Sequence, residues 1–345
     1  MQAWYNECML NIFGKKQKIE FLAVGDIVTD AFIRIKEAHI SNDPITKKVE
    51  LSLSYGNKVP FEFVEIVRAV GNSANAAVAA ARLGVESSLV ASVGNDEEGE
   101  KCLEKLKEEN VDTSNVLINK GKKTNYHYVL WYEMDRTILV KHEDFKYKFP
   151  KDGDPSWIYL SSLGEHAMGL HDEIANFLET HPQTKLVFQP GTFQIKLGIE
   201  KLSRIYKKAD IFFCNVEEAE LILEKPMGTD IKELLSGIRT LGPKIVVITD
   251  GPKGSYGDDG TKAFFLPAYP DQKPAYDRTG AGDGFASTTT VGIILGKPLS
   301  EAMKWGSVNS MSVVQEIGAQ KGLLSKEKLE EYLKSAPLDW NIQTI

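Results

Sequence analysis

Strand-like and helix-like runs alternate along most of this chain, and this order constrains its fold more than any other feature. The strand-like runs are at residues 19–24, 88–93, 157–160, 185–188, 211–214 and 245–249. The helix-like runs are at residues 72–83, 97–109, 171–179, 216–223 and 231–241, followed by 299–314 and 326–334. Such alternation is typical of a parallel sheet covered by helices. We therefore predict an α/β fold with a mainly parallel central sheet flanked by helices.

Two regions break this alternation. Residues 31–64 contain strands separated by a polar loop at 41–48, and residues 124–142 indicate a hairpin that turns at 133–136. Both regions are rich in β-forming side chains and would make a small second sheet. A length of 345 residues suits one large α/β domain with such an appendage. We assign residues 19–345 to this domain and residues 1–18 to a loosely held N-terminal extension.

Charge and hydropathy exclude several classes of protein. The formal net charge of −7 argues against binding to nucleic acid, which needs a basic surface. No apolar run approaches the roughly 20 residues that span a bilayer, and the first 17 residues lack the apolar core of a signal peptide. Cys8, Cys102 and Cys214 are too scattered for a disulfide framework or a zinc site. We expect a cytoplasmic protein with small-molecule ligands and no membrane partner.

A segment of small residues late in the chain has the chemistry of an anion site. Gly280, Ala281 and Gly282 run directly into an apolar helix, so their backbone N–H groups lie at a helix start, which attracts anions. Asp283 follows at once, and a carboxylate beside a phosphate is useful if an attacking hydroxyl must lose its proton. The alternative is a helix cap with an Asp in its first turn. Local chemistry leaves both interpretations open.

Five motifs in order resemble one family. The pattern Asp277-Arg278-Thr279-Gly280-Ala281-Gly282-Asp283 is similar to the long signature of the ribokinase-like (PfkB) carbohydrate kinases. Upstream, residues 70–84 resemble the family's glycine-rich turn that opens an alanine-rich helix, and residues 92–99 fit its G-x-D-x-x-G turn. Residues 215–218 fit N-x-x-E, and residues 249–254 fit T-x-G-x-x-G. The resemblance covers about residues 19–324.

The resemblance implies ATP-dependent phosphorylation of a hydroxymethyl group on a sugar of the ribose or ketohexose type. Asp283 would be the general base, and the backbone of residues 280–282 would form the anion hole. By the same resemblance, the acceptor hydroxyls would be bound by Asp30, Gly71, Asn72 and Asn75. Asn72 and Asn75 also suit a helix N-cap and a polar first turn, respectively.

Further positions are assigned to the nucleotide and to ions through the resemblance. The nucleotide side would comprise Asn215, Glu218, Thr249, Gly251, Gly254 and Asn309, although a core-facing position is the alternative for Asn309 and an ordinary hairpin for residues 249–254. Glu218 would hold Mg²⁺ largely through water. Asp277 and Thr279, with the loop at 318–322, correspond to a monovalent-cation site in many relatives, where K⁺ is the candidate ion.

The two β-rich regions, 31–64 and 124–142, would be a lid over the sugar site and a homodimer contact, as in relatives. Val70-Gly71 stands where the family usually has two glycines, so hinge motion would depend on Gly71 alone. Because the aromatic strand at 126–132 could hold a base, a nucleoside acceptor is the alternative. A non-catalytic sugar-sensing relative is a further alternative, but it would be expected to lose Asp283 or its flanking glycines. Gln189-Pro190 stands where relatives often carry Asn-Pro, and no role is assigned to Gln189.

Overall fold

A large, mainly parallel sheet forms the body of the protein in the computed structural model, which describes residues 19–43, 49–133, 135–150 and 153–345. In this part of the chain the parallel strands follow the order β7 (Val116–Asn119), β6 (Ser87–Gly94), β1 (Phe21–Val24), β10 (Trp157–Leu160), β11 (Lys185–Phe188), β12 (Ile211–Asn215) and β13 (Ile245–Thr249). Three antiparallel strands extend it: β14 (Ser255–Asp258), β15 (Ala263–Leu266) and β16 (Gln343–Thr344). The predicted extension at 1–18 lies outside the described residues.

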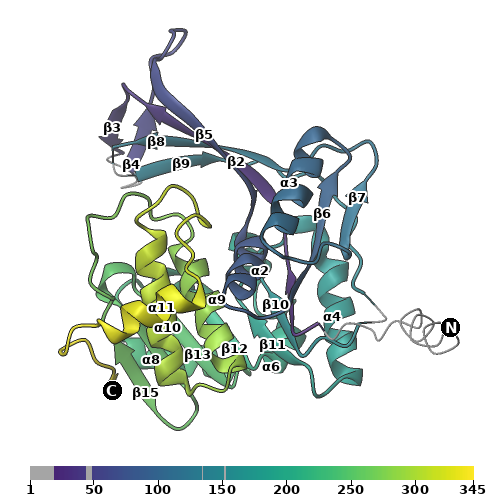
Figure 1. Ribbon diagram of the computed structural model, residues 1–345, viewed down its shortest axis with the longest axis vertical. Helices are drawn as coiled ribbons and strands as arrows, with labels where there is room; N and C mark the ends of the chain where they lie inside the picture. The colour runs from purple at the N-terminus through teal and green to yellow at the C-terminus, as the bar shows by residue number, and fades with distance from the viewer. Residues whose placement is uncertain (1–18, 44–48, 134, 151–152) are drawn as a thin grey trace, which may run out of the picture.

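Helices cover both faces of this sheet, as Figure 1 shows. One face packs on α2 (Asn72–Arg82), α3 (Glu97–Glu108), α9 (Ala281–Ile294), α10 (Leu299–Val313) and α11 (Lys326–Lys334). The other packs on α4 (Met168–Thr180), α6 (Ser203–Lys208), α7 (Val216–Ile222) and α8 (Ile231–Thr240), with α5 (Thr192–Leu197) beside them. Successive strand residues, such as Phe212 and Phe213, fall in opposite cores because side chains alternate along a strand. Both faces of the sheet are therefore buried.

A second sheet stands above the body (Figure 1), in the strand order β5 (Phe61–Val70), β2 (Val28–Ile35), β8 (Tyr126–Tyr132) and β9 (Asp135–Leu139). A further hairpin joins β3 (His39–Asn42) to β4 (Val49–Ser52). The face toward the body packs Phe32, Val129 and Trp131 on Ile317. Trp131 also meets Tyr276 edge-on, with ring centroids 5.1 Å apart. Apolar contact thus seats this sheet, which we call the lid sheet, on the segment that carries the signature.

The junction between lid sheet and body has unusual backbone. Gly71 has φ +115°, and a Cβ there would lie 2.5 Å from the Asp26 carbonyl oxygen. Ala69 adopts φ +56°, a left-handed conformation that costs a non-glycine residue roughly 1–2 kcal/mol. Val70, between them, is buried and outside that region. The two residues with positive φ therefore lie on either side of Val70, whose β-branched side chain disfavours that conformation.

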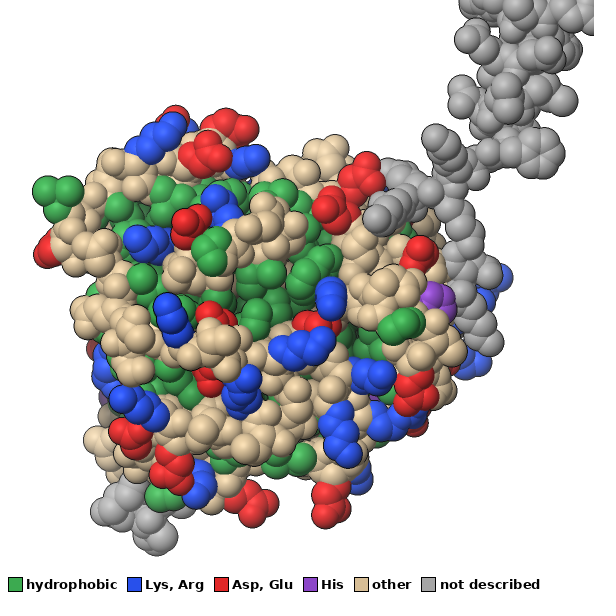
Figure 2. Space-filling view, turned by 90° about the horizontal axis from the view of Figure 1, so that it is seen from below, with side chains coloured by type: hydrophobic (Ala, Val, Ile, Leu, Met, Phe, Trp, Pro, Cys, Tyr) green, Lys and Arg blue, Asp and Glu red, His purple; other side chains and the backbone are tan. Residues whose placement is uncertain are grey.

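The six predicted strands and the predicted helices are present, with ends displaced by a few residues. Strands β7, β14, β15 and β16 and helices α5 and α6 were not predicted, because elements of two to six residues are too short to show a period. In the described residues, no helix is long and apolar enough to cross a membrane. On the face opposite the lid sheet, Lys and Arg side chains lie interspersed with Asp and Glu (Figure 2).

Candidate active site

The signature segment forms the start of helix α9, and its small residues have distinct roles. Gly280 is the N-cap residue with φ +78°, and no side chain caps the helix. An added Cβ at Gly280 would lie 2.2 Å from the Ala319 Cβ, so only glycine allows the loop at 318–322 to pack here. A Cβ at Gly282 would meet nothing within 4 Å. Because N–H groups at a helix start have no intrahelical partner, this open side is suited to an anion.

Asp283 lies in the first turn of α9, yet its carboxylate bonds to side chains rather than to the helix start. Its Oδ1 accepts from Asn72 Nδ2 at 2.9 Å and from Gln189 Nε2 at 3.1 Å, and its Oδ2 accepts from Asn75 Nδ2 at 2.8 Å. The side chain is buried, and burial raises its pKa above the ordinary 3.8, while the three amide donors act in the opposite direction. This geometry is not that of a helix cap.

The predicted acceptor residues lie at the start of α2 and on strand β2 of the lid sheet. Asn72 and Asn75 lie on the first turn of α2, whose N-cap residue is Gly71, and both donate to Asp283. Asp30 lies buried on β2, with its Oδ1 3.3 Å from His127 Nδ1 on the neighbouring strand β8. Asp30 Oδ1 and His127 Nε2 are buried without a hydrogen-bond partner. Unpaired buried polar atoms are costly, which suits a site that binds a hydroxylated ligand.

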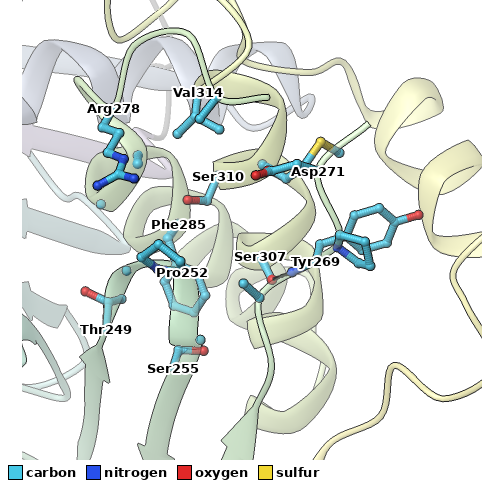
Figure 3. Close-up of a pocket in the computed structure, with 18 residues that line it drawn as sticks. Thr249, Pro252, Ser255, Tyr269, Asp271, Arg278, Phe285, Ser307, Ser310 and Val314 are labelled. Carbon is cyan, nitrogen blue, oxygen red and sulfur yellow. Dashed lines mark hydrogen bonds between the residues drawn. The ribbon is translucent and has the colours of Figure 1, made fainter. Parts of the chain in front are cut away.

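A pocket of about 470 Å³ lies beside the helix start and is the candidate nucleotide site. Ala281 and Gly282 line it together with Thr249 at the end of β13, Gly251 in the turn η2 (Gly251–Lys253) and Gly254 directly after that turn. Figure 3 shows Thr249, Pro252 and Ser255 on one side, with Ser307, Ser310 and Val314 from α10 and its end across from them. The T-x-G-x-x-G segment, which joins two antiparallel strands, is thus both a hairpin and part of the pocket wall.

Asn309, which was assigned to the nucleotide side, does not line this pocket. Its side chain is fully buried, donates to Thr288 Oγ1 at 2.6 Å and accepts from the Leu324 N–H at 2.9 Å. Its neighbours Ser307, Ser310 and Met311 line the pocket instead. Asn309 thus occupies the core-facing position that was the alternative for it, because a helix presents residues one position apart in different directions.

Asn215 and Glu218 form a capping box at the start of α7. Asn215 Oδ1 accepts from the Glu218 N–H at 2.8 Å, and Glu218 Oε2 accepts from the Asn215 N–H at 2.9 Å. Burial raises the pKa of Glu218, the Asn215 N–H lowers it, and the nearby charges of Asp283 and Glu217 raise it. A divalent cation would relieve this repulsion between carboxylates. In the described residues no three acidic, His or Cys side chains form a metal cluster.

Asp277 and Thr279 are tied to each other and to the lid sheet. Asp277 Oδ1 accepts from the Thr279 N–H at 2.9 Å and from Thr279 Oγ1 at 2.6 Å, and Asp277 Oδ2 accepts from the Gly318 N–H at 2.8 Å. Arg136 of β9 places its Nη1 3.6 Å from Asp277 Oδ1. A positive charge from the lid sheet therefore already faces the predicted monovalent-cation site.

Sequence reasoning missed two residues at the site. Gln189, at the carboxyl end of β11, contacts Asp283, and Arg278 of the signature lines the pocket beside Gly282. Arg278 has a signal in the sequence, because a cation within a glycine-rich anion site suits phosphate binding. For Gln189 the only signal in the sequence is its position directly after a parallel strand, because ligand sites in α/β sheets lie at the carboxyl ends of the strands.

Comparison with known proteins shows the family to which the chain belongs. The profile of the pfkB family carbohydrate kinases matches residues 65–326. The chain is 28% identical to a nucleoside kinase of Methanothermobacter thermautotrophicus over 73% of this chain and 80% of that protein. It is 25% identical to a ribokinase of Bacillus subtilis over 76% of this chain and 87% of that protein.

The solved structure of Arabidopsis thaliana ribokinase complexed with ribose and ATP superimposes with a TM-score of 0.74, at 18% identity, over 92% of this chain and 99% of that one. This likeness confirms the predicted ribokinase-like fold, with a mainly parallel sheet between helices and a small second sheet. The family match extends over most of the chain and includes the signature that starts α9. The chain therefore belongs to the pfkB family of carbohydrate kinases and is a sugar or nucleoside kinase of that family.

Proposed function

We propose that this protein transfers the γ-phosphoryl group of ATP to a hydroxymethyl group of a sugar of the ribose or ketohexose type. One observation carries the proposal: the Asp283 carboxylate is held by amide side chains beside an open helix start that lines the pocket. An ionised carboxylate next to an anion site is the arrangement that this transfer requires.

In the proposed reaction Asp283 removes the proton of the acceptor hydroxyl. The acceptor oxygen then bonds to the γ-phosphorus, the bond from that phosphorus to the β–γ bridging oxygen breaks, and ADP leaves. Backbone N–H groups of residues 280–282 stabilise the charge on the phosphoryl oxygens. Arg278 adds a cation at the same pocket. Glu218 and Asn215 would hold Mg²⁺ through water, and when bound Mg²⁺ neutralises charge on the triphosphate.

Asp30, Gly71, Asn72 and Asn75 are proposed to bind the acceptor. Asp30 Oδ1 and His127 Nε2 are buried and have no hydrogen-bond partner, which supports a ligand with hydroxyl groups, because a hydroxyl can donate to the first and either donate to or accept from the second. A nucleoside is the second candidate acceptor, since a nucleoside kinase is among the similar proteins. The intact Asp283 and glycines disfavour a non-catalytic sugar sensor.

The lid sheet is proposed to close over the acceptor and to form a homodimer contact. Its outer face exposes Val64, Ile66, Tyr128 and Leu139, each 42–51% accessible. Ile66, Tyr128 and Leu139 lie in one cross-strand row through Ala31, so they share a face. An apolar sheet face of this kind is typical of a protein interface. K⁺ beside Asp277 and Thr279 is proposed as an additional ion.

The test is a phosphorylation screen with ATP and Mg²⁺ over D-ribose, ketohexoses and nucleosides, with product phosphorylation read by mass spectrometry. Asp283→Asn is the matched control because it keeps the shape and removes the base. We expect phosphorylation by the wild type and a loss of about 10²–10⁴ in kcat for Asp283→Asn. Asp283→Asn activity within threefold of the wild type would show that Asp283 is not the base.

A further inference from the structure

Gln189 joins the candidate base to the sheet behind it. It follows β11, where its backbone N–H donates to the Leu160 carbonyl oxygen at 2.9 Å. Its Nε2 donates to Asp283 Oδ1 at 3.1 Å, and its Oε1 accepts from the hydroxyl of Tyr159 on the adjacent strand β10. Its side chain thus connects a fully buried phenol to the carboxylate proposed to take the proton.

Tyr159 determines which way the Gln189 amide points. If the amide were flipped, its oxygen would face the Asp283 carboxylate, and two acceptors would meet without a proton between them. Burial, followed by the charge of Asp283, raises the pKa of Tyr159, so its hydroxyl keeps the proton that it donates to Gln189 Oε1. The donor side of the amide is therefore directed at Asp283.

A second amide pair holds the carboxylate from the opposite side. Gln320 Nε2 donates to the Ala69 carbonyl oxygen at 2.7 Å and to Asn75 Oδ1 at 3.1 Å, which leaves the Asn75 amide donor aimed at Asp283 Oδ2. A carboxylate has about four lone-pair sites, and Asn72, Asn75 and Gln189 occupy three of them. One site remains for an acceptor hydroxyl.

We propose that Gln189, oriented by Tyr159, is a positioning residue that holds the Asp283 carboxylate in the rotamer and the ionised form needed to accept a proton. The proposal rests on the proposed role of Asp283 as the base. The charge of Asp283 raises the pKa of both Tyr159 and Glu218, so these two titratable side chains lie within its electrostatic reach. Neither supplies a positive charge, and the side chains that donate to the carboxylate are the amides of Asn72, Asn75 and Gln189.

The first experiment needs no acceptor. The free energy of unfolding of the wild type and Gln189→Leu is measured by denaturant titration from pH 4.5 to 9. Because the pKa of Asp283 is raised by folding, its contribution favours the folded state at low pH and is lost as the pH rises through the folded pKa. Loss of the Gln189 donor raises this pKa further. We expect Gln189→Leu to lose about 1.4 kcal/mol more at high pH than at low pH, equivalent to about one pKa unit.

The matched control is Gln183→Leu, which makes the same change at an exposed glutamine before β11, at the opposite end of this strand. Its stability difference from the wild type should not depend on pH. A difference for Gln189→Leu that is equal at every pH would overturn the proposal, since a residue that only fills space has no reason to follow the charge of Asp283. If Gln189→Leu does not fold, Gln189→Glu keeps the volume and places a second carboxylate at Asp283, so its pH-dependent loss should be larger.

The second experiment is the pH profile of kcat/KM with ATP, Mg²⁺ and D-ribose, or the best acceptor of the screen. Gln189→Leu should move the acidic limb of this profile to higher pH by about one unit. At pH values below that limb, kcat/KM should be about tenfold lower than in the wild type, and at high pH it should recover. Tyr159→Phe should move it in the same direction by less. An unmoved limb would overturn the proposal. An active Asp283→Asn enzyme would instead show that Asp283 is not the base. Failure of the Gln189 proposal and failure of the proposed function are therefore distinguishable.

Discussion

Two glycines of the signature provide a test that separates a phosphate site from a plain helix start. Gly280 and Gly282 are two residues apart, yet the structure gives them opposite surroundings. A Cβ at Gly280 would lie 2.2 Å from the Ala319 Cβ and 2.5 Å from its Cα, and φ there is +78°. A Cβ at Gly282 would meet no atom within 4 Å, although Gly282 itself is one of the residues that line the pocket.

The expected magnitudes follow from these surroundings. Gly280→Ala would place an alanine in a left-handed conformation, which costs roughly 1–2 kcal/mol. The added methyl group would also be overpacked against Ala319, which costs about 1–3 kcal/mol. The free energy of unfolding should therefore fall by roughly 2–5 kcal/mol. Gly282→Ala lies within α9, where alanine is favoured over glycine by about 0.5–1 kcal/mol, so its stability should be unchanged or higher. Its methyl group would keep a phosphate from the backbone.

The assay combines guanidinium unfolding with ADP release in the presence of ATP, Mg²⁺ and D-ribose or the best acceptor of the screen. Loss of one backbone donor to a developing charge costs about 10²–10³ in rate, so Gly282→Ala should lose about a hundredfold in kcat/KM while remaining stable. A stable Gly282→Ala enzyme with full activity would refute the anion site and leave a simple helix start. A fully stable Gly280→Ala protein would refute the close contact with Ala319.

Three further predictions concern ions and the lid sheet. Glu218→Ala should raise the Mg²⁺ concentration needed for half-maximal rate by about tenfold with little change in sugar KM, and a change in sugar KM alone would contradict its placement. Arg136→Ala removes the charge 3.6 Å from Asp277, so activation by K⁺ relative to tetramethylammonium should be larger than in the wild type; equal activation would disconnect Arg136 from the ion site. Amide hydrogen exchange in β5 and β8 should slow when D-ribose or the best acceptor of the screen binds, and equal exchange with and without acceptor would argue against closure.

Local patterns in the sequence were sufficient for the fold class and for the helix that carries the signature. Alternating runs predicted the parallel strands β1, β6, β10, β11, β12 and β13, and the small residues before an apolar run predicted the start of α9. These features depend on neighbours a few residues apart, which is the range over which periodicity and capping act. Short strands at the sheet edge lack such a period, so β14 to β16 appeared only in the structure.

The partners of Asp283 were decided by tertiary structure. Asn72 is 211 residues away in sequence, Asn75 is 208 and Gln189 is 94, and the strand order of the sheet brings all three to one carboxylate. Family resemblance placed the two asparagines near the acceptor, but no periodicity relates them to the aspartate. The same limit explains Asn309, whose orientation depends on which face of α10 packs on α9. A sequence encodes which side chains are available, whereas the packing of distant elements determines which of them share a site.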